Sequence, residues 1–290
     1  MEKIVIGVSD AASMKAVEWV IDRARTELLE VTLVGAYDWT GTPFSEVAKM
    51  LREVRSRIGA ASPRTVVHLV ESEDDPDEAL ARATEHADLL VIGSHQRTLL
   101  QERFGVRALR LARQENCATI IVPEQWTPRH SGAVVVGLDE ASSSAALDFA
   151  VQHAERSAAR LEVVHAWTAP LPAYDPLVWI TDTEGELRVI HRKRLDATLD
   201  RLKFEHPDVR AAGYLEESLP AAAIRDRGKG ADLVVIGSHR NGPIVRALLG
   251  STARDLLRNA TVPLCIVPTR AATGTPEPVS NSAGEGAKSR

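Results

Sequence analysis

The chain alternates short apolar runs with longer segments in which apolar residues recur every three or four positions. In the first half, the runs "KIVIGV", "VTLVGAY", "TVVHLV", "DLLVIG" and "TIIVP" are rich in β-branched residues and predict five buried strands. The segments between them predict four helices, at residues 14–29, 44–60, 76–87 and 106–116. Alternating strands and helices favour a parallel sheet with right-handed crossovers and helices on both faces.

The same order of elements occurs twice in the chain. "IVIGVSDAAS" resembles "VVVGLDEASS", so that Gly7 aligns with Gly137 at an offset of 130 residues. Further along, Gly93 aligns with Gly237 at an offset of 144. The chain is therefore a tandem duplication, and the second copy carries 14 additional residues after its second strand.

The repeat predicts an N-terminal domain at 1–124 and a C-terminal domain at 132–269. The tail at 270–290 is rich in Gly, Pro, Ser and Ala and is predicted to be disordered. The fold class is α/β, with two doubly wound five-stranded parallel sheets of Rossmann-like or flavodoxin-like order 3-2-1-4-5. The last strands, "TIIV" and "LCIV", would be apolar edges. We expect them to pair antiparallel across a pseudo-two-fold axis, which makes the chain an internal pseudo-dimer.

Composition and charge narrow the class of protein. Apolar residues make up 44% and charged residues 26% of 290, and the net charge is −5 with acids and bases interspersed, so nothing indicates a nucleic-acid partner. No apolar run is long enough to cross a membrane, and the N-terminus lacks the layout of a signal peptide, which favours a cytoplasmic protein. Cys117 and Cys265 are interpreted as buried reduced thiols rather than a bridge, and no metal site is indicated.

Candidate binding chemistry lies where the strand order would reverse. In a doubly wound sheet this crevice lies beyond the carboxyl ends of strands one and four. In the second copy Asp139 follows strand one and Gly237 ends strand four, while Gly250, Ser251 and Thr252 open the next helix. Free N–H groups and hydroxyls at a helix start suit phosphate. The simpler alternative is that Ser251, Thr252 and Asp139 only cap helices.

These residues resemble the universal stress protein family, and the tandem layout resembles its two-domain members. ATP-binding members carry Gly-x-x-Gly, nine residues, then Gly-Ser or Gly-Thr, with an Asp after the first strand. Gly237, Gly250-Ser251 and Asp139 match this motif, whereas Arg240 replaces the second glycine. The resemblance implies stress-related regulation and binding of ATP, with or without Mg²⁺, and implies that the backbone of Ala166 meets the adenine edge.

The first copy departs further from the motif. Ser9 stands at the position of the Asp, Gln96 replaces the second glycine after Gly93, and Gly105 comes one residue early and precedes Val106. The fold is needed twice because the halves pair, but the phosphate site need be present only once. We therefore expect the second copy to bind the nucleotide and the first to be degenerate.

Two further features have alternative interpretations. The insertion carries Trp167, Tyr174 and Trp179, which either cover an adenine or pack against one another in a surface loop. His95 and His239 follow Gly-Ser in both copies, but no partner for catalysis accompanies them, so a structural or solvated role is favoured.

The leading hypothesis is a stress-related adenine-nucleotide binding protein whose role is regulatory, with a homodimer as a possible assembly. A second hypothesis is a slow ATPase in which Asp139 or His239 orients water. A third is a dimerising interaction module without nucleotide, which Arg240 in place of glycine favours.

Overall fold

The structure is a computed structural model that describes residues 1–9, 13–36, 44–94, 117–128, 132–138, 143–168, 183–238 and 251–268. The elements of the first half are β1 (Glu2–Gly7), α1 (Ser13–Ala24), β2 (Leu29–Ala36), α2 (Phe44–Ala61), β3 (Val66–Ser72), α3 (Pro76–Ala83), β4 (Leu89–Ser94) and β5 (Ala118–Pro123). Those of the second half are β6 (Ala133–Gly137), α5 (Ser143–Ser157), β7 (Arg160–Trp167), α6 (Thr183–Glu205), β8 (Ala211–Glu217), α7 (Pro220–Arg227), β9 (Leu233–Ser238), α8 (Ser251–Arg258) and β10 (Leu264–Pro268).

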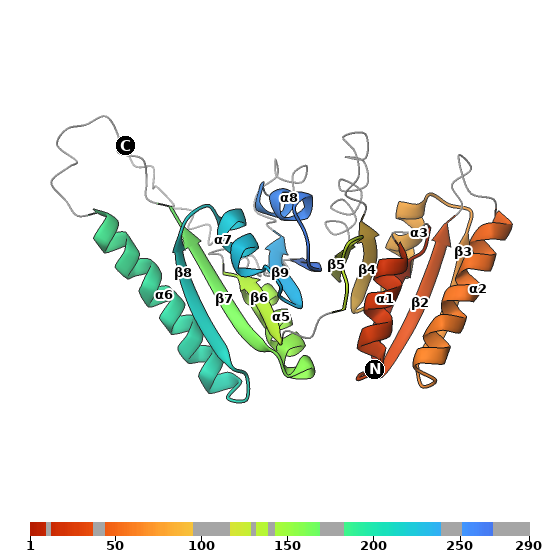
Figure 1. Ribbon diagram of the computed structural model, residues 1–290, viewed down its shortest axis with the longest axis horizontal. Coiled ribbons are helices and arrows are strands. Elements are labelled where there is room, and N and C mark those ends of the chain that lie inside the picture. Colours follow the sequence, from red (N-terminus) through yellow and green to blue (C-terminus); the bar gives the residue numbers. More distant parts are fainter. Residues whose placement is uncertain are drawn as a thin grey trace, which may run out of the picture.

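All ten strands form one continuous sheet with the order β3-β2-β1-β4-β5-β10-β9-β6-β7-β8. Each half has the predicted order 3-2-1-4-5 with parallel neighbours, and the halves join through antiparallel pairing of β5 with β10. Both predictions are confirmed. The arrowheads of β2, β4, β7 and β9 point to the same side of the molecule, so the carboxyl ends of both halves face that side (Figure 1).

The pseudo-two-fold axis passes through a single residue pair. Ile120 pairs with Cys265, and these two residues occupy equivalent positions in the two copies, at the offset of 145 that relates Pro123 to Pro268. Cys117, by the same offset, corresponds to Val262 and not to Cys265. The two cysteines belong to hydrophobic cores on opposite faces of the sheet, and both are buried reduced thiols as predicted.

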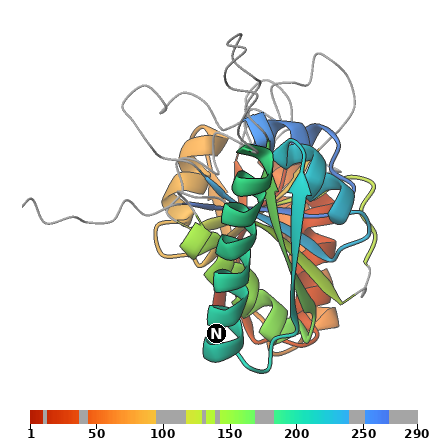
Figure 2. The same ribbon diagram turned by 90° about the vertical axis from the view of Figure 1, so that its left-hand side faces the viewer.

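Each face of the sheet carries its own set of helices. Side chains of α1, α2, α5 and α6 pack on one face, and side chains of α3, α7 and α8 pack on the other. The strands supply both cores by alternation, since Ile4 and Ile6 belong to the first and Val5 to the second. In Figure 2 the green helix α6 runs along the outer strands β7 and β8.

Two predicted helix ends were wrong. Helix α1 ends at Ala24 rather than at residue 29, because Leu29 is fully buried as the first residue of β2, where it pairs with Glu2. Helix α3 ends at Ala83 rather than at residue 87, and the hydroxyl of Thr84 donates to the carbonyl of Leu80 at its end. The predicted helix at 106–116 and the predicted disordered tail lie outside the described residues.

The two halves also meet through α1 and α5. The Arg23 guanidinium donates from Nη1 to Nδ1 of His153 at 3.0 Å, and these residues are equivalent at the offset of 130. Glu2 accepts hydrogen bonds from Arg23 and, across the interface, from Arg156 at 2.9 Å. The halves therefore share a buried polar contact as well as a sheet.

Candidate functional site

The crevice of the second half lies between β6 and β9. Strand β6 pairs with β7 on one side and with β9 on the other, so the chain reverses its strand order here. Val136 pairs with Val235, which brings the end of β6 level with Gly237 near the end of β9. The described backbone therefore forms the switch point at which doubly wound sheets bind ligands.

Helix α8 begins at Ser251, as the sequence indicates, and lies beside the arrowhead end of β9 (Figure 1). Ser251 is exposed and Thr252 is partly exposed, whereas Ala253 and Leu256 are buried and fix the helix on the sheet. The first N–H groups of a helix have no partners within it and carry a partial positive charge. Helix starts of this kind favour anions.

Ala166 is the second-last residue of strand β7. Gly137 pairs with Val164, so Ala166 stands two residues further along β7, at the level that the chain reaches after leaving β6. Its own partner on the outer side is Glu216 of β8. The backbone of Ala166 is thus at the carboxyl edge of the sheet, where the resemblance places it.

The structure describes only part of the predicted site. Gly237 and Ala166 lie near the carboxyl ends of β9 and β7, and Ser251 and Thr252 are the first described residues of α8, which packs against α7 and β10. The remaining predicted residues lie outside the described residues: Asp139, Arg240 and Gly250 of the second half, Gln96 and Gly105 of the first, and also His95, His239, Tyr174 and Trp179.

In the first half, Ser9 and Gly93 occupy the corresponding edge. Ile6 of β1 pairs with Val91 of β4, so the switch point is formed in the same way. Ser9 is exposed, and its backbone N–H donates to the Ser13 hydroxyl at 3.3 Å. A serine hydroxyl at this position cannot supply the negative charge of the aspartate that follows β6.

A pair of histidines beside the crevice was missed by the sequence analysis. His165 of β7 is buried, and its Nε2 lies 2.8 Å from Nδ1 of His191 on α6. The other ring nitrogen of His165 lies 3.2 Å from the carbonyl of Leu138, the residue that precedes Asp139. Trp167 stacks on His191 with ring centroids 5.3 Å apart, so this aromatic of the insertion packs within the protein.

The hydrogen bonds fix the tautomers of this pair. A carbonyl only accepts, so Nδ1 of His165 carries the hydrogen and donates it to Leu138. Nε2 of His165 then accepts from Nδ1 of His191. The pair forms a chain of hydrogen bonds from α6 to the backbone of Leu138.

A comparison of aligned positions in the two copies could have indicated this histidine pair. His165 aligns with Gly35 at the offset of 130, and His191 aligns with Val47 at the offset of 144. In the first half, a Cβ added to Gly35 would lie 2.5 Å from Cγ1 of Val47, so the same two positions are in contact there too. A glycine-valine contact in one copy is thus replaced by two imidazoles in the other.

Within the described part of the chain, no three His, Cys, Asp or Glu side chains gather as metal ligands would. Over the same residues, no helix has both the length and the apolar character needed to span a bilayer.

A family model described as the universal stress protein family matches residues 1–123 and again 132–268. The chain belongs to the universal stress protein family. A universal stress protein of Mycolicibacterium smegmatis is 25% identical over 288 residues, covering 91% of this chain and 96% of that protein. One of Mycobacterium tuberculosis is 27% identical over 231 residues, covering 76% and 75%.

Solved structures show the same architecture. A universal stress protein from Archaeoglobus fulgidus superposes with a TM-score of 0.68 at 18% identity, covering 92% of this chain and 98% of that one. The cytoplasmic domain of a prokaryotic cation chloride cotransporter superposes with a TM-score of 0.57 at 11% identity, covering 92% and 95%. Because the tandem fold also occurs in a transporter domain, the function must be argued from the site.

Proposed function

We propose that the second half binds ATP or a related adenine nucleotide, with or without Mg²⁺, and that binding serves a regulatory rather than a catalytic role. The observation that supports this proposal most directly is the described first turn of α8, with Ser251 exposed and Thr252 partly exposed, in the half whose strands β6 and β9 form the switch point. A phosphate group at this place would meet unpaired N–H groups, the positive end of a helix dipole and two hydroxyls.

Each residue of the site has a distinct role in the proposal. The first turn of α8, with the hydroxyls of Ser251 and Thr252, holds the phosphate oxygens, and Gly250 lets the backbone approach them. Arg240 adds a guanidinium in place of the family's glycine. Asp139 accepts a hydrogen bond from the ribose or the adenine amino group, and the backbone of Ala166 meets the adenine edge. Mg²⁺, when bound, would offset the phosphate charge.

The histidine pair supports the aspartate end of this site. His165 donates to the carbonyl of Leu138, and His191 holds His165 from helix α6. Leu138, the residue before Asp139 in the sequence, is thereby tied to α6, the helix that follows the 14-residue insertion. The first half has no such tie, since Gly35 and Val47 occupy these positions.

The regulatory role rests on the sequence, in which no motif supplies a nucleophile or a general base. A regulatory nucleotide acts by binding one conformation or assembly of the protein more tightly than another. Slow hydrolysis with Asp139 orienting water is the catalytic alternative, and it predicts phosphate release that Asp139→Ala abolishes.

The test is calorimetric titration of the full-length protein with ATP. Asp139→Ala should weaken binding by about tenfold to about 150-fold, because a lost hydrogen bond to a charged group costs about 1.5–3 kcal/mol. The matched control is Ser9→Ala, which alters the equivalent position of the first half and should leave ATP binding unchanged.

Two outcomes would contradict the proposal. Equal weakening by Ser9→Ala would show that the first half also binds, and absence of ATP binding in the wild type would favour the nucleotide-free interaction module. Acid extraction of the purified protein gives an independent check, since a bound adenine nucleotide would be released into the extract.

A further inference from the structure

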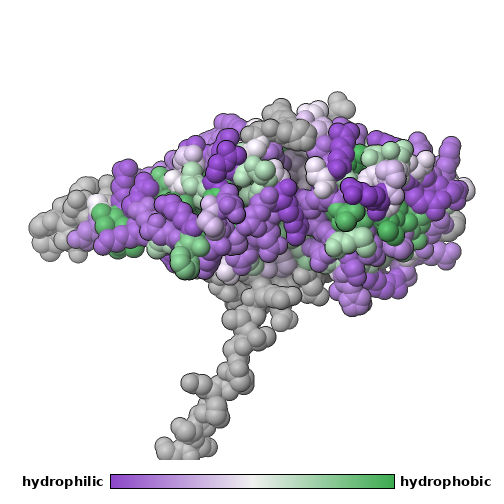
Figure 3. Space-filling view, turned by 90° about the horizontal axis from the view of Figure 1, so that it is seen from below, coloured by the Kyte–Doolittle hydropathy of each residue, from purple (hydrophilic) through white to green (hydrophobic). Residues whose placement is uncertain are grey.

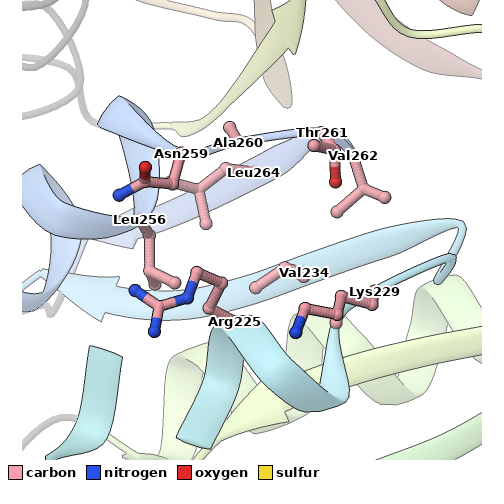
Figure 4. Close-up of a pocket in the computed structure, with 10 residues that line it drawn as sticks. Arg225, Lys229, Val234, Leu256, Asn259, Ala260, Thr261, Val262 and Leu264 are labelled. Carbon is pink, nitrogen blue, oxygen red and sulfur yellow. The ribbon is translucent and has the colours of Figure 1, made fainter. Parts of the chain in front are cut away.

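A second pocket lies at the end of the second half that is remote from the switch point. It is enclosed by the last turns of α7 and α8 and by the first residues of β9 and β10, and its volume is about 110 Å³ (Figure 4). The phosphate-binding end of α8 is at Ser251, whereas the pocket contacts Leu256 in its last turn. The pocket is therefore separate from the proposed nucleotide site.

The interior of this pocket is apolar. Its walls are formed by Val234 of β9, Leu256 of α8, Leu264 of β10 and Val262, which precedes β10, and each is at least nine-tenths buried. A water molecule needs two to four polar partners to be held in such a space. The walls favour an apolar group over water.

The rim of the pocket is cationic. The side chains of Arg225 and Lys229 lie on the α7 side of the pocket, with Leu264 and Val262 on the other side (Figure 4). Both pair with the same carboxylate, Asp226, at 3.9 Å and 2.8 Å respectively. One carboxylate balances only one of the two cations, which leaves a positive charge at the opening.

The cationic rim is particular to the second copy. At the offset of 144, Arg225 corresponds to Ala81 and Lys229 to Glu85, so the first copy has no cation at either position. The wall differs too, because Val262 corresponds to Cys117. Since the first copy folds the same way without them, the two cations are not needed to form this corner of the fold.

We propose that this pocket binds a compact amphiphilic anion, with an aromatic or branched apolar group of about benzene size and a carboxylate. The apolar group occupies the space over the paired residues Val234 and Leu264, against Leu256, and the carboxylate meets Arg225 and Lys229 at the rim. An apolar cavity of about 150 Å³ is known to accept benzene, so a space of this order accepts one ring and no larger ring system.

The test uses ¹⁹F NMR titration of the full-length protein with 4-fluorobenzoate, and with fluorobenzene as the neutral ligand of the same shape. The dissociation constant for 4-fluorobenzoate should be on the order of 1 mM, since a small ligand has few atoms with which to make contacts. Arg225→Gln should weaken 4-fluorobenzoate at least threefold and leave fluorobenzene unchanged. Val262→Phe fills the space and should abolish binding of both.

The control variant is Arg201→Gln, which removes a half-exposed arginine from α6, on the opposite face of the sheet, and should change neither affinity. If Val262→Phe does not fold, the proposal is still tested by comparing the affinity for 4-fluorobenzoate of Arg225→Gln with that of Arg201→Gln. The proposal is overturned if 4-fluorobenzoate shows no saturable binding, or if Arg225→Gln and Arg201→Gln affect it equally.

Discussion

At the residue scale, the two copies form the same contact between a strand and a helix with different residues. In the first half, β2 and α2 approach so closely at Gly35 that a Cβ would lie 2.5 Å from Cγ1 of Val47 and 3.0 Å from Cδ1 of Leu51. In the second half, the same positions hold His165 and His191, and the contact becomes a hydrogen bond of 2.8 Å. Glycine is therefore required at position 35, because Val47 leaves no room for a side chain there.

Gly35→Ala should destabilise the protein by about 1–3 kcal/mol, because the added methyl group overpacks a closed core. The double variant Gly35→Ala/Val47→Ala removes the atom in the way and should recover part of this loss. The measurement is the free energy of unfolding in urea.

The matched control is Gly59→Ala in α2, where a Cβ meets no atom within 4 Å. Alanine has the higher helix propensity, so this variant should be neutral or about 0.5–1 kcal/mol more stable. Equal destabilisation by both alanines would show that the contact with Val47 does not matter.

Part of the site could be predicted from the sequence at this scale. The helix at Ser251 was predicted, because a glycine followed by hydroxyl residues before an apolar pattern is a local signal, and Ser251 is the first described residue of α8. The contact of His165 with His191 was not, because it joins a strand to a helix across the 14-residue insertion. No spacing rule connects such residues, and only comparison with Gly35 and Val47 shows that they meet.

At the element scale, α1 and α5 meet near the pseudo-two-fold axis with unlike residues at equivalent positions. Two arginines facing each other would repel, whereas Arg23 donates to a neutral His153 at 3.0 Å. Trp19 and its equivalent Phe149 both stack on the His153 ring, at centroid distances of 6.4 Å and 6.3 Å. The two copies have diverged at this position, so that the cation Arg23 of the first copy faces a hydrogen-bond acceptor, His153, in the second.

Burial, together with the nearby cations Arg23 and Arg156, lowers the pKa of His153 to about 3. The ring stays neutral in the folded protein, while the unfolded chain takes up a proton near pH 6.5. We expect the contribution of His153 to stability to be complete above pH 6.5 and to fall as the pH drops toward 3, by at most about 1.4 kcal/mol per pH unit.

Urea unfolding at several pH values checks this, with His153→Gln as the control. The glutamine oxygen can still accept from Arg23 but does not titrate, so the variant should lose less stability between pH 6.5 and 3. The neighbouring Glu27, whose pKa is raised by burial, contributes the opposite slope in both proteins. Parallel curves for the two proteins would contradict the assignment.

The type and order of the described elements followed from the sequence, but two helix ends did not. The apolar periodicity that predicted a helix at 14–29 continues up to Leu29. Leu29 nevertheless belongs to β2, where it pairs with Glu2. A leucine suits the buried face of a helix and of a strand equally, so local pattern cannot decide between them. Sheet pairing with a residue 27 positions away decides instead.

At the scale of the whole molecule, one sheet joins both halves, as the two apolar last strands indicated. Ile120 and Cys265 are completely buried where the axis crosses the sheet. The contacts of α1 with α5 add a second link. We therefore expect wild-type unfolding to be a single cooperative transition.

Ile120→Asp should separate this transition into two, because a carboxylate buried at the axis costs several kcal/mol and weakens the link between the halves. Unfolding in urea can be followed by tryptophan fluorescence, since Trp19 lies at the contact of α1 with α5 and Trp167 lies within the second half. Val66→Asp, a similar change on the half-exposed edge strand β3, should keep one transition. Separation in both variants would show that the halves are not coupled.

The outer surface has few large hydrophobic groups. Seen from the side opposite the carboxyl ends of the strands, the described surface is mainly hydrophilic, with small separate hydrophobic areas (Figure 3). Exposed apolar side chains include Val189, Ile190 and Phe204 on α6. Scattered residues of this kind are ordinary on a soluble surface and carry no argument for a partner.

The antiparallel pairing of β5 with β10 affects how the two halves can evolve. Because each half is permanently held to a partner of different sequence, a substitution in one copy is never mirrored in the other, as it would be in a dimer of identical subunits. Selection can then act on each crevice separately. Gly35 and His165, or Ala81 and Arg225, show how far such independent change has gone on a shared backbone.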